Sequence, residues 1–267
     1  MVDIEQLTML YFENDKPVPY NLKCGEEVLI HPVKVEDWAQ FELSIPILKI
    51  EKSETDDVDI IQMSYLSFIK MLIDGDSKGI YSSMLRTILE NSLKLNNIML
   101  MPQGNKTTIV GELNELKPFI IIEPKEFDDI KTIILFQNIY DYDDRYISPD
   151  VRQLYQDYLA TVKSDAIDPS LERKKIFVIS KSGIMMKDLN KMSYRIFNQI
   201  YINLVETDMY YANKMLQASQ KYDVKDDIIY PLFVKKKDKY ADLFVSKSSV
   251  ESKIGKINGW QNILSMI

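Results

Sequence analysis

The stretch from Asp188 to Tyr222 constrains the fold most, because it is the longest run with helical periodicity and without proline or glycine. Its apolar residues recur at steps of three and four, which is the spacing of one face of an α-helix. These residues are Tyr194, Phe197, Tyr201, Leu204, Val205, Met209, Ala212, Met215 and Leu216. We therefore expect a single long helix that forms the main core element of a helix-rich protein.

Charge and cysteine content narrow the class of protein. The 267 residues carry a formal net charge of -7, and an acidic chain is a poor match for the phosphates of nucleic acids. Cys24 is the only cysteine, so no intramolecular disulfide can form and a reducing compartment is expected. The sequence begins with no secretory signal, and its apolar runs are too short to span a bilayer. We expect a soluble cytoplasmic protein whose partners are proteins, with no nucleic acid and no membrane.

Strand and helix signals alternate along the first part of the chain. Residues 1–24 contain two prolines and predict a strand or an arm. A strand over 28–30 stops at Pro32, and the helix that begins at Val35 ends or kinks at Pro46. Further helices are predicted over 59–72, 82–95, 127–137, 149–162 and 171–180.

Three short apolar segments between residues 97 and 124 read as strands of a small meander, because Gly104, Asn105 and Pro118 separate them. The fold class predicted is therefore α+β, predominantly helical with a small antiparallel β meander. We expect an N-terminal α+β region over 1–146, a helical region over 147–222 and a polar C-terminal tail over 223–267.

One short pattern occurs twice in the chain. Met63-Ser64-Tyr65-x-x-Phe68 reappears as Met192-Ser193-Tyr194-x-x-Phe197, and both copies open a predicted helix. Helix capping by serine and aromatic packing at a three-residue spacing explain the repeat. An internal duplication is the alternative explanation.

Candidate motifs for chemistry are incomplete. The run from Gly104 to Thr108 lacks the first glycine of a phosphate-binding loop, so a hairpin turn is expected there. The run from Asp141 to Asp144 resembles the start of a calcium loop, but it lacks the later glycine and glutamate. His31 and Cys24 are each unique in the chain, so neither a zinc cluster nor a His-based triad can be assembled. We expect no catalytic, cofactor or metal site, hence a protein that is not an enzyme, with His31 at a strand end and Cys24 as a structural thiol.

Two surface features suggest protein binding instead. The lysines at 235–239 predict a solvated segment or a docking arm. The long stripe divides into core residues at its start, Tyr194, Phe197, Tyr201 and Leu204, and partner-facing residues near its end. The partner-binding residues predicted are Met209, Tyr210, Met215 and Leu216, since methionine and tyrosine adapt well to apolar partners.

Four segments together resemble proteins encoded among the tail genes of bacteriophages that infect Gram-positive bacteria. These segments are VLIHPVKVEDWAQF, MSYLSF, DDRYISPDVRQLYQDYL and KDLNKMSYRIFNQIYINL. The arrangement is similar to that of tail assembly chaperone-like proteins, in which a strand and a helix precede helical segments opened by Met-Ser/Thr-Tyr-x-x-Phe. The strands between residues 97 and 124 look like an insertion in that pattern.

The resemblance implies a non-catalytic role in tail assembly, in the host cytoplasm. The partner would be the tape-measure protein or another tail protein, bound while the tail tube polymerises. The alternative that it leaves open is a structural subunit of the virion, such as a tail, baseplate or connector component.

Overall fold

The structure is a computed structural model that describes residues 3–50, 52, 57–104, 106–113, 119–140, 142–143, 169–219 and 230. The chain divides into two compact units, one of residues 1–145 with 165–209 and the other of 146–164 with 210–267. Nearly all of the described residues belong to the first unit. The three regions expected from the sequence stay a prediction.

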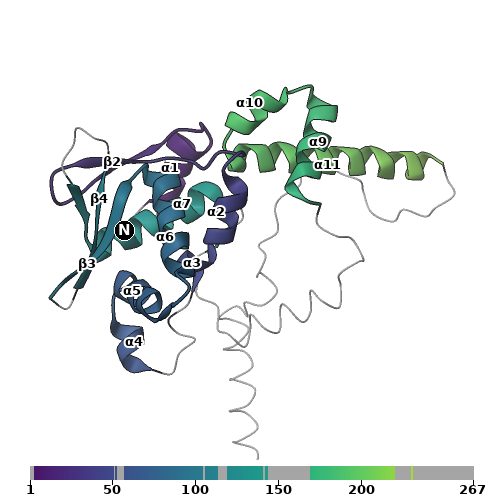
Figure 1. Cartoon of the computed structure of the whole chain (residues 1–267). Coiled ribbons are helices and arrows are strands. Elements are labelled where there is room, and N and C mark those ends of the chain that lie inside the picture. The colour runs from purple at the N-terminus through teal and green to yellow at the C-terminus, as the bar shows by residue number, and fades with distance from the viewer. Residues whose placement is uncertain are drawn as a thin grey trace, which may run out of the picture. The chain divides into compact units, whose positions relative to one another are not determined.

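The protein is α+β and mostly helical, as predicted (Figure 1). Its described helices are α1 (Ile4–Leu7), the π-helix η1 (Thr8–Phe12), α2 (Trp38–Ser44), α3 (Pro46–Lys49), α4 (Val58–Gln62), α5 (Tyr65–Gly75), α6 (Ile80–Leu93), α7 (Pro124–Asn138), α9 (Leu171–Ser182), α10 (Met186–Lys191) and α11 (Tyr194–Ala218). Its described strands are β1 (Val18–Asn21), β2 (Glu27–Ile30), β3 (Asn96–Gln103), β4 (Lys106–Glu112) and β5 (Phe119–Ile122).

The strands form two small antiparallel sheets. β1 and β2 pair as a hairpin, and β3, β4 and β5 form the meander predicted between residues 97 and 124. Gln103 pairs with Lys106 across the β3–β4 turn, where Gly104 has a φ of +62°. Such a left-handed conformation suits glycine in a two-residue hairpin turn. Gly104 therefore lies at the hairpin turn expected between β3 and β4.

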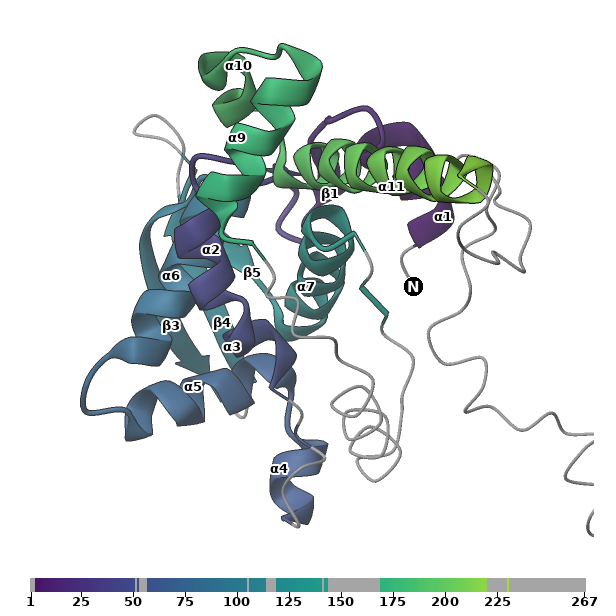
Figure 2. The same ribbon diagram turned by 90° about the vertical axis from the view of Figure 1, so that its right-hand side faces the viewer.

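The main hydrophobic core lies between the helices and the inner face of the three-stranded sheet. Helices α5 and α7 contact β4, and α5 also packs on both α6 and α7, an arrangement that Figure 2 shows from the side. Helix α7 begins with a capping box between Glu123 and Glu126, which ties down its first turn. The buried side chains of α6 and α7 include Leu85, Ile88, Leu89, Phe127, Ile130 and Ile134.

The single helix predicted over 188–222 is wrong, and α6 and α7, not this element, form the main core. The backbone N–H of Val35 donates to the carbonyl of Met192 at 2.9 Å, and the N–H of Tyr194 donates to the carbonyl of Val33 at 2.8 Å. These bonds hold Met192 in an extended conformation that separates α10 from α11. Only Arg195 and Phe197 are buried in α11, so most of that helix lies on the surface.

A second, smaller hydrophobic cluster joins α9, α10 and the start of α11. Its buried residues are Val35, Val178, Leu189 and Phe197, and the partly buried residues packed against them include Tyr194, Tyr201 and Leu204. Tyr194, Phe197, Tyr201 and Leu204 are the core residues predicted in this helix. The prediction is confirmed for Phe197, which is fully buried, and confirmed in part for the other three, which are partly buried. Ser170 caps α9 and Gly183 ends it at φ +73°, so the helix predicted over 171–180 is confirmed.

Two other segments differ from expectation. Residues 4–12 are helical and not extended, because Asp3 caps α1 by accepting from the N–H of Gln6 at 3.1 Å. The helix predicted over 59–72 is broken between α4 and α5, where Ser64 caps α5 by accepting from the N–H of Ser67 at 3.1 Å. In both cases a short polar side chain satisfies backbone groups at a helix start and thereby decides where that helix begins.

The two Met-Ser-Tyr copies adopt the same local structure. Met63 and Met192 each follow a short helix in an extended conformation, and Ser64 and Ser193 each accept from the N–H three residues later. Phe68 and Phe197 are both buried. The helix predicted over 149–162, the residues Asp141 and Asp144, and the lysines at 235–239 lie outside the described residues.

Candidate functional site

The four predicted partner-binding residues all lie on α11. Met209, Met215 and Leu216 are between 44% and 73% exposed. Tyr210 is half-buried and makes edge-on ring contacts with Tyr211 and Tyr230. The first three side chains are therefore accessible, and their contact with a partner stays a prediction.

The outer face of the three-stranded sheet is a second exposed apolar surface, and none of its residues is among the predicted partner-binding residues. Met99, Val110 and Ile121 lie side by side across the three strands, and Phe119 is opposite Glu112. Four side chains of this face are between 45% and 52% exposed, namely Met99, Met101, Phe119 and Ile121. We refer to these four residues as the outer sheet face.

This surface is unusual because the opposite face of the same sheet is also apolar. Ile109, Ile120 and Ile122 point the other way and are fully buried in the main core. An antiparallel sheet with one face in a core normally presents polar side chains on its other face. The continuous apolar runs 98–101 and 119–122, which lack the usual alternation, are the sequence signal that could have revealed this surface.

A cavity of about 190 Å³ lies beside β3, on the inner side of the sheet. It is lined by Lys70, Ile73, Asp74, Ser82, Leu85, Arg86, Ile98 and Leu100. Lys70 and Asp74 form an ion pair with an N–O distance of 2.6 Å. Ile98 and Leu100 are only half-buried, so the core is incompletely covered along this edge of the sheet.

A wider and shallower groove of about 550 Å³ runs along α2 and α3. Its lining residues are Trp38, Glu42, Ile45, Pro46, Lys49, Ile50 and Ile139. The indole of Trp38 stacks on the ring of Tyr194, with ring centres 3.5 Å apart. Five of the seven lining residues are apolar, and Trp38 among them belongs to the packing that holds the start of α11.

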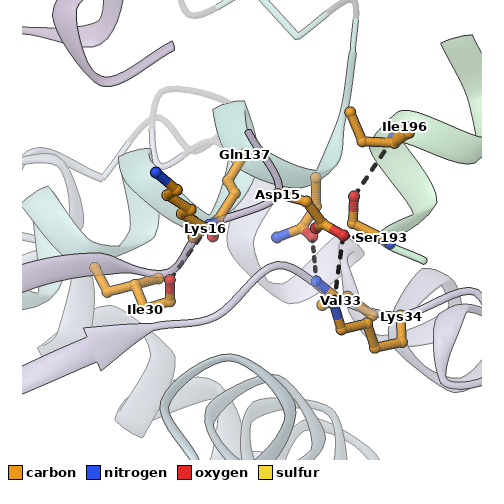
Figure 3. Close-up of polar contacts among 9 residues, drawn as sticks. Asp15, Lys16, Ile30, Val33, Lys34, Gln137, Ser193 and Ile196 are labelled. Carbon is orange, nitrogen blue, oxygen red and sulfur yellow. Dashed lines mark hydrogen bonds and ion pairs between the residues drawn. The ribbon is translucent and has the colours of Figure 1, made fainter. Parts of the chain in front are cut away.

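A buried polar junction connects four parts of the chain: the turn between η1 and β1, the segment after β2, α7 and α11 (Figure 3). The amide of Asn138 accepts from the N–H of Val33 at 2.8 Å, and the amide of Gln137 donates to the carbonyl of Ile30 at 3.2 Å. Arg195 donates to the carbonyl of Phe136 at 2.8 Å. Each of these side chains binds a main-chain group of a neighbouring segment, so the junction is structural.

Two titratable side chains of α7, Lys131 and Asp128, also have shifted pKa values. Burial lowers the pKa of Lys131, whose ammonium lies 3.6 Å from the centre of the Tyr65 ring, and burial raises the pKa of Asp128. Lys131 and Asp128 line neither the cavity beside β3 nor the groove along α2 and α3. The contact of Lys131 with the Tyr65 ring joins α7 to α5 and stabilises that packing.

His31 and Cys24 lie apart from these features. His31 follows β2, at a strand end as expected, and it is half-buried. Cys24 lies exposed in the β1–β2 turn, so its expected structural role is wrong. The described residues contain no group of three His, Cys, Asp or Glu side chains placed to hold a metal ion. Within the same residues, no helix combines the length and the apolar character needed to cross a bilayer.

Comparisons with known protein families, with curated protein sequences and with solved structures find no match. The geometry of the chain therefore carries the functional argument. Within the described residues, exposed apolar side chains gather on the outer sheet face beside the edge of β3, and also near the end of α11.

Proposed function

We propose that this protein is a non-catalytic binding protein whose outer sheet face covers an apolar surface of another protein. The observation that carries the proposal is the half-exposed state of Met99, Met101, Phe119 and Ile121 on a sheet whose other face is already buried. Contiguous exposed apolar side chains on a folded domain mark an interaction site more often than an ordinary surface.

We further propose, from the resemblance described above, that the partner is a tail protein of a bacteriophage, such as the tape-measure protein. In this role the protein would hold an aggregation-prone chain in the host cytoplasm until assembly. Met209, Met215 and Leu216 on α11 supply additional accessible apolar contacts for a long partner.

Co-expression with a tape-measure protein tests this proposal. The wild-type chain should keep the partner soluble and be recovered with it, because burial of the outer sheet face replaces contact with water. A double variant, Met99→Thr with Phe119→Thr, should remain folded and lose most of that recovery. Val58→Thr is the matched control, since Val58 is an exposed apolar residue on α4.

Mass spectrometry of washed phage particles separates the two roles. A chaperone is absent from the mature particle, whereas a structural subunit is present in it at a constant ratio. Recovery of the partner that is equal for the wild-type chain and the double variant would contradict the proposed use of the outer sheet face.

A further inference from the structure

We infer that the open edge of β3 binds an extended segment of the partner protein, which adds to the sheet as a further strand. The segment would carry alternating apolar side chains and an acidic residue next to Arg86. This inference rests on the proposed binding function and specifies the chemistry of the partner.

The first observation is that β3 has a free edge. Among the strands that the structure describes, the order is β3-β4-β5, and β3 is hydrogen-bonded to β4 alone. In an antiparallel hairpin, successive residues present their N–H and C=O groups alternately to the partner strand and to the opposite edge. Counting from the Gln103–Lys106 pair at the turn, Leu100 presents both groups to the open edge, and Pro102, which has no backbone N–H, presents its C=O alone.

The second observation is that this edge is only partly protected. Edge strands are commonly shielded by lysine, proline or irregular pairing. β3 has Pro102 near one end and a pairing irregularity between Asn96 and Met99 near the other. Residues 99–101 between them carry no charge, so they remain a template for strand addition.

The third observation is the cavity of about 190 Å³ on the inner side of this edge. A cavity of about 150 Å³ accommodates a benzene ring, so this one has room for a bulky apolar side chain. Such a side chain would cover Ile98 and Leu100, which are half-buried, in contrast to the fully buried Ile109 of β4. An added strand would thus complete the core at the place where it is open.

The fourth observation is the charge of the cavity wall. The Lys70–Asp74 ion pair is internally neutral. Arg86 on α6 is exposed, and within the part of the chain that the structure describes its guanidinium has no hydrogen-bond or ion-pair partner. Guanidinium binds carboxylates through paired hydrogen bonds, which favours a glutamate or aspartate in the bound segment. A second copy of β3 has no acidic residue over 96–103 and so lacks this complement.

A synthetic peptide as long as β3 is the probe for this site. It alternates valine and threonine, with one valine replaced by glutamate, and a second version has lysine at that position. Titration into the full-length protein, followed by amide signals in nitrogen-proton NMR spectra, gives the dissociation constants. We expect shifts at Leu100 and at the residues that line the cavity.

Charge exchange and amide methylation make the test specific. Arg86→Glu should weaken binding of the glutamate peptide about tenfold and strengthen binding of the lysine peptide by a similar factor. Arg173→Glu, on the exposed surface of α9, should change neither value. Two further peptides are methylated on every second backbone amide, one at the odd and one at the even positions. One of them should lose binding and the other should keep it, because only one edge of an added strand pairs with β3.

Absence of binding at millimolar peptide, or equal binding of the two methylated peptides, would overturn the inference. Formation of dimers that slow hydrogen exchange of the β3 amides in the absence of peptide would also overturn the inference. The occupant of the edge would then be a second copy of this protein. If the tail protein is held by the wild-type chain and equally by Arg86→Glu, the edge inference fails while the proposed function stands. If no partner is held, the proposed function fails whatever the peptides show.

Discussion

The side-chain carboxylate of Asp15 accepts a hydrogen bond from the backbone N–H of Ser193 at 3.3 Å, across a separation of 178 residues. The same oxygen lies 3.5 Å from the ammonium of Lys34, as Figure 3 shows. One carboxylate therefore joins the turn between η1 and β1, the segment after β2 and the start of α11. Asp15 itself has a φ of +54°, a left-handed conformation that aspartate and asparagine adopt more readily than most residues.

Replacement of Asp15 tests this joint. Asp15→Ala should lower the free energy of unfolding by about 1 to 2 kcal/mol, because it leaves the N–H of Ser193 without its acceptor. Asp15→Asn should lose less, since asparagine keeps an acceptor and tolerates the positive φ. Urea unfolding measures both. Asp188→Ala, at an exposed position on α10, is the control and should stay within about 0.5 kcal/mol. Equal losses for alanine and asparagine would contradict the assigned hydrogen bond.

The two serine caps should differ in strength. Ser64→Ala should cost about 1 kcal/mol of stability, because its hydroxyl accepts from the N–H of Ser67 at 3.1 Å. Ser193→Ala should cost less, since the corresponding distance to the N–H of Ile196 is 3.5 Å. Thermal unfolding of each variant provides the comparison. Ser83→Ala, within α6 and exposed, controls for the change in helix propensity. A larger loss at Ser193 than at Ser64 would show that its cap is not the weaker one.

Two adjacent isoleucines of β5 should differ in how much stability is lost when each is replaced by alanine. Ile120→Ala should cost about 2 to 5 kcal/mol, because Ile120 is fully buried in the main core. Ile121→Ala should cost less than about 1 kcal/mol, because its side chain is half-exposed on the outer sheet face. Chemical denaturation gives both values. Equal losses would mean that the outer sheet face is covered within the folded chain.

Helix α11 should be anchored at its start alone. Phe197→Ala should cost about 3 to 5 kcal/mol, because Phe197 is fully buried in the smaller cluster. Met215→Ala, on the same helix and exposed, should stay within about 0.5 kcal/mol. Calorimetric unfolding compares the two variants. A large loss at Met215 would contradict its assignment as an accessible contact.

His31 should make stability depend on pH in the mildly acidic range. Burial, together with the nearby Lys94 and Lys34, lowers the pKa of His31 below its ordinary value of 6.5. The unfolded chain then binds the proton more tightly, so this contribution to stability is complete above pH 6.5 and declines as pH falls below that value. His31 is the only histidine, so NMR titration of its ring reports the pKa directly.

The control for this prediction is His31→Gln. The difference in unfolding free energy between this variant and the wild-type chain should change with pH below 6.5 and stay constant above it. A His31 pKa at or above the ordinary value would contradict the burial of the ring.

Local signals were sufficient for much of the fold. The meander over 97–124, the end of the first helix before Pro46 and the limits of α9 at Ser170 and Gly183 all follow from residues whose conformational preferences are strong. The Met-Ser-Tyr repeat correctly marked two helix starts. Except at Met192 and Ser193, the deciding interaction lies within a few residues of the signal.

The long helix shows where local reasoning stops. Its periodicity continues through Met192 and Ser193, yet hydrogen bonds from the segment 33–35 divide it there. The functional surface depends on the same kind of information. The apolar runs in β3 and β5 show that both faces of these strands are hydrophobic, but only the packing of α5 and α7 on one face decides which side chains remain exposed.

The sequence by itself determined the class of this protein, the kinds of element in it and most of their order, because capping, turn formation and periodicity act over short distances. The tertiary structure alone decided that α11 is a surface helix anchored through Phe197, and that the outer sheet face and the edge of β3 stay open. Burial depends on which distant segments meet, and that is settled only when the whole chain packs.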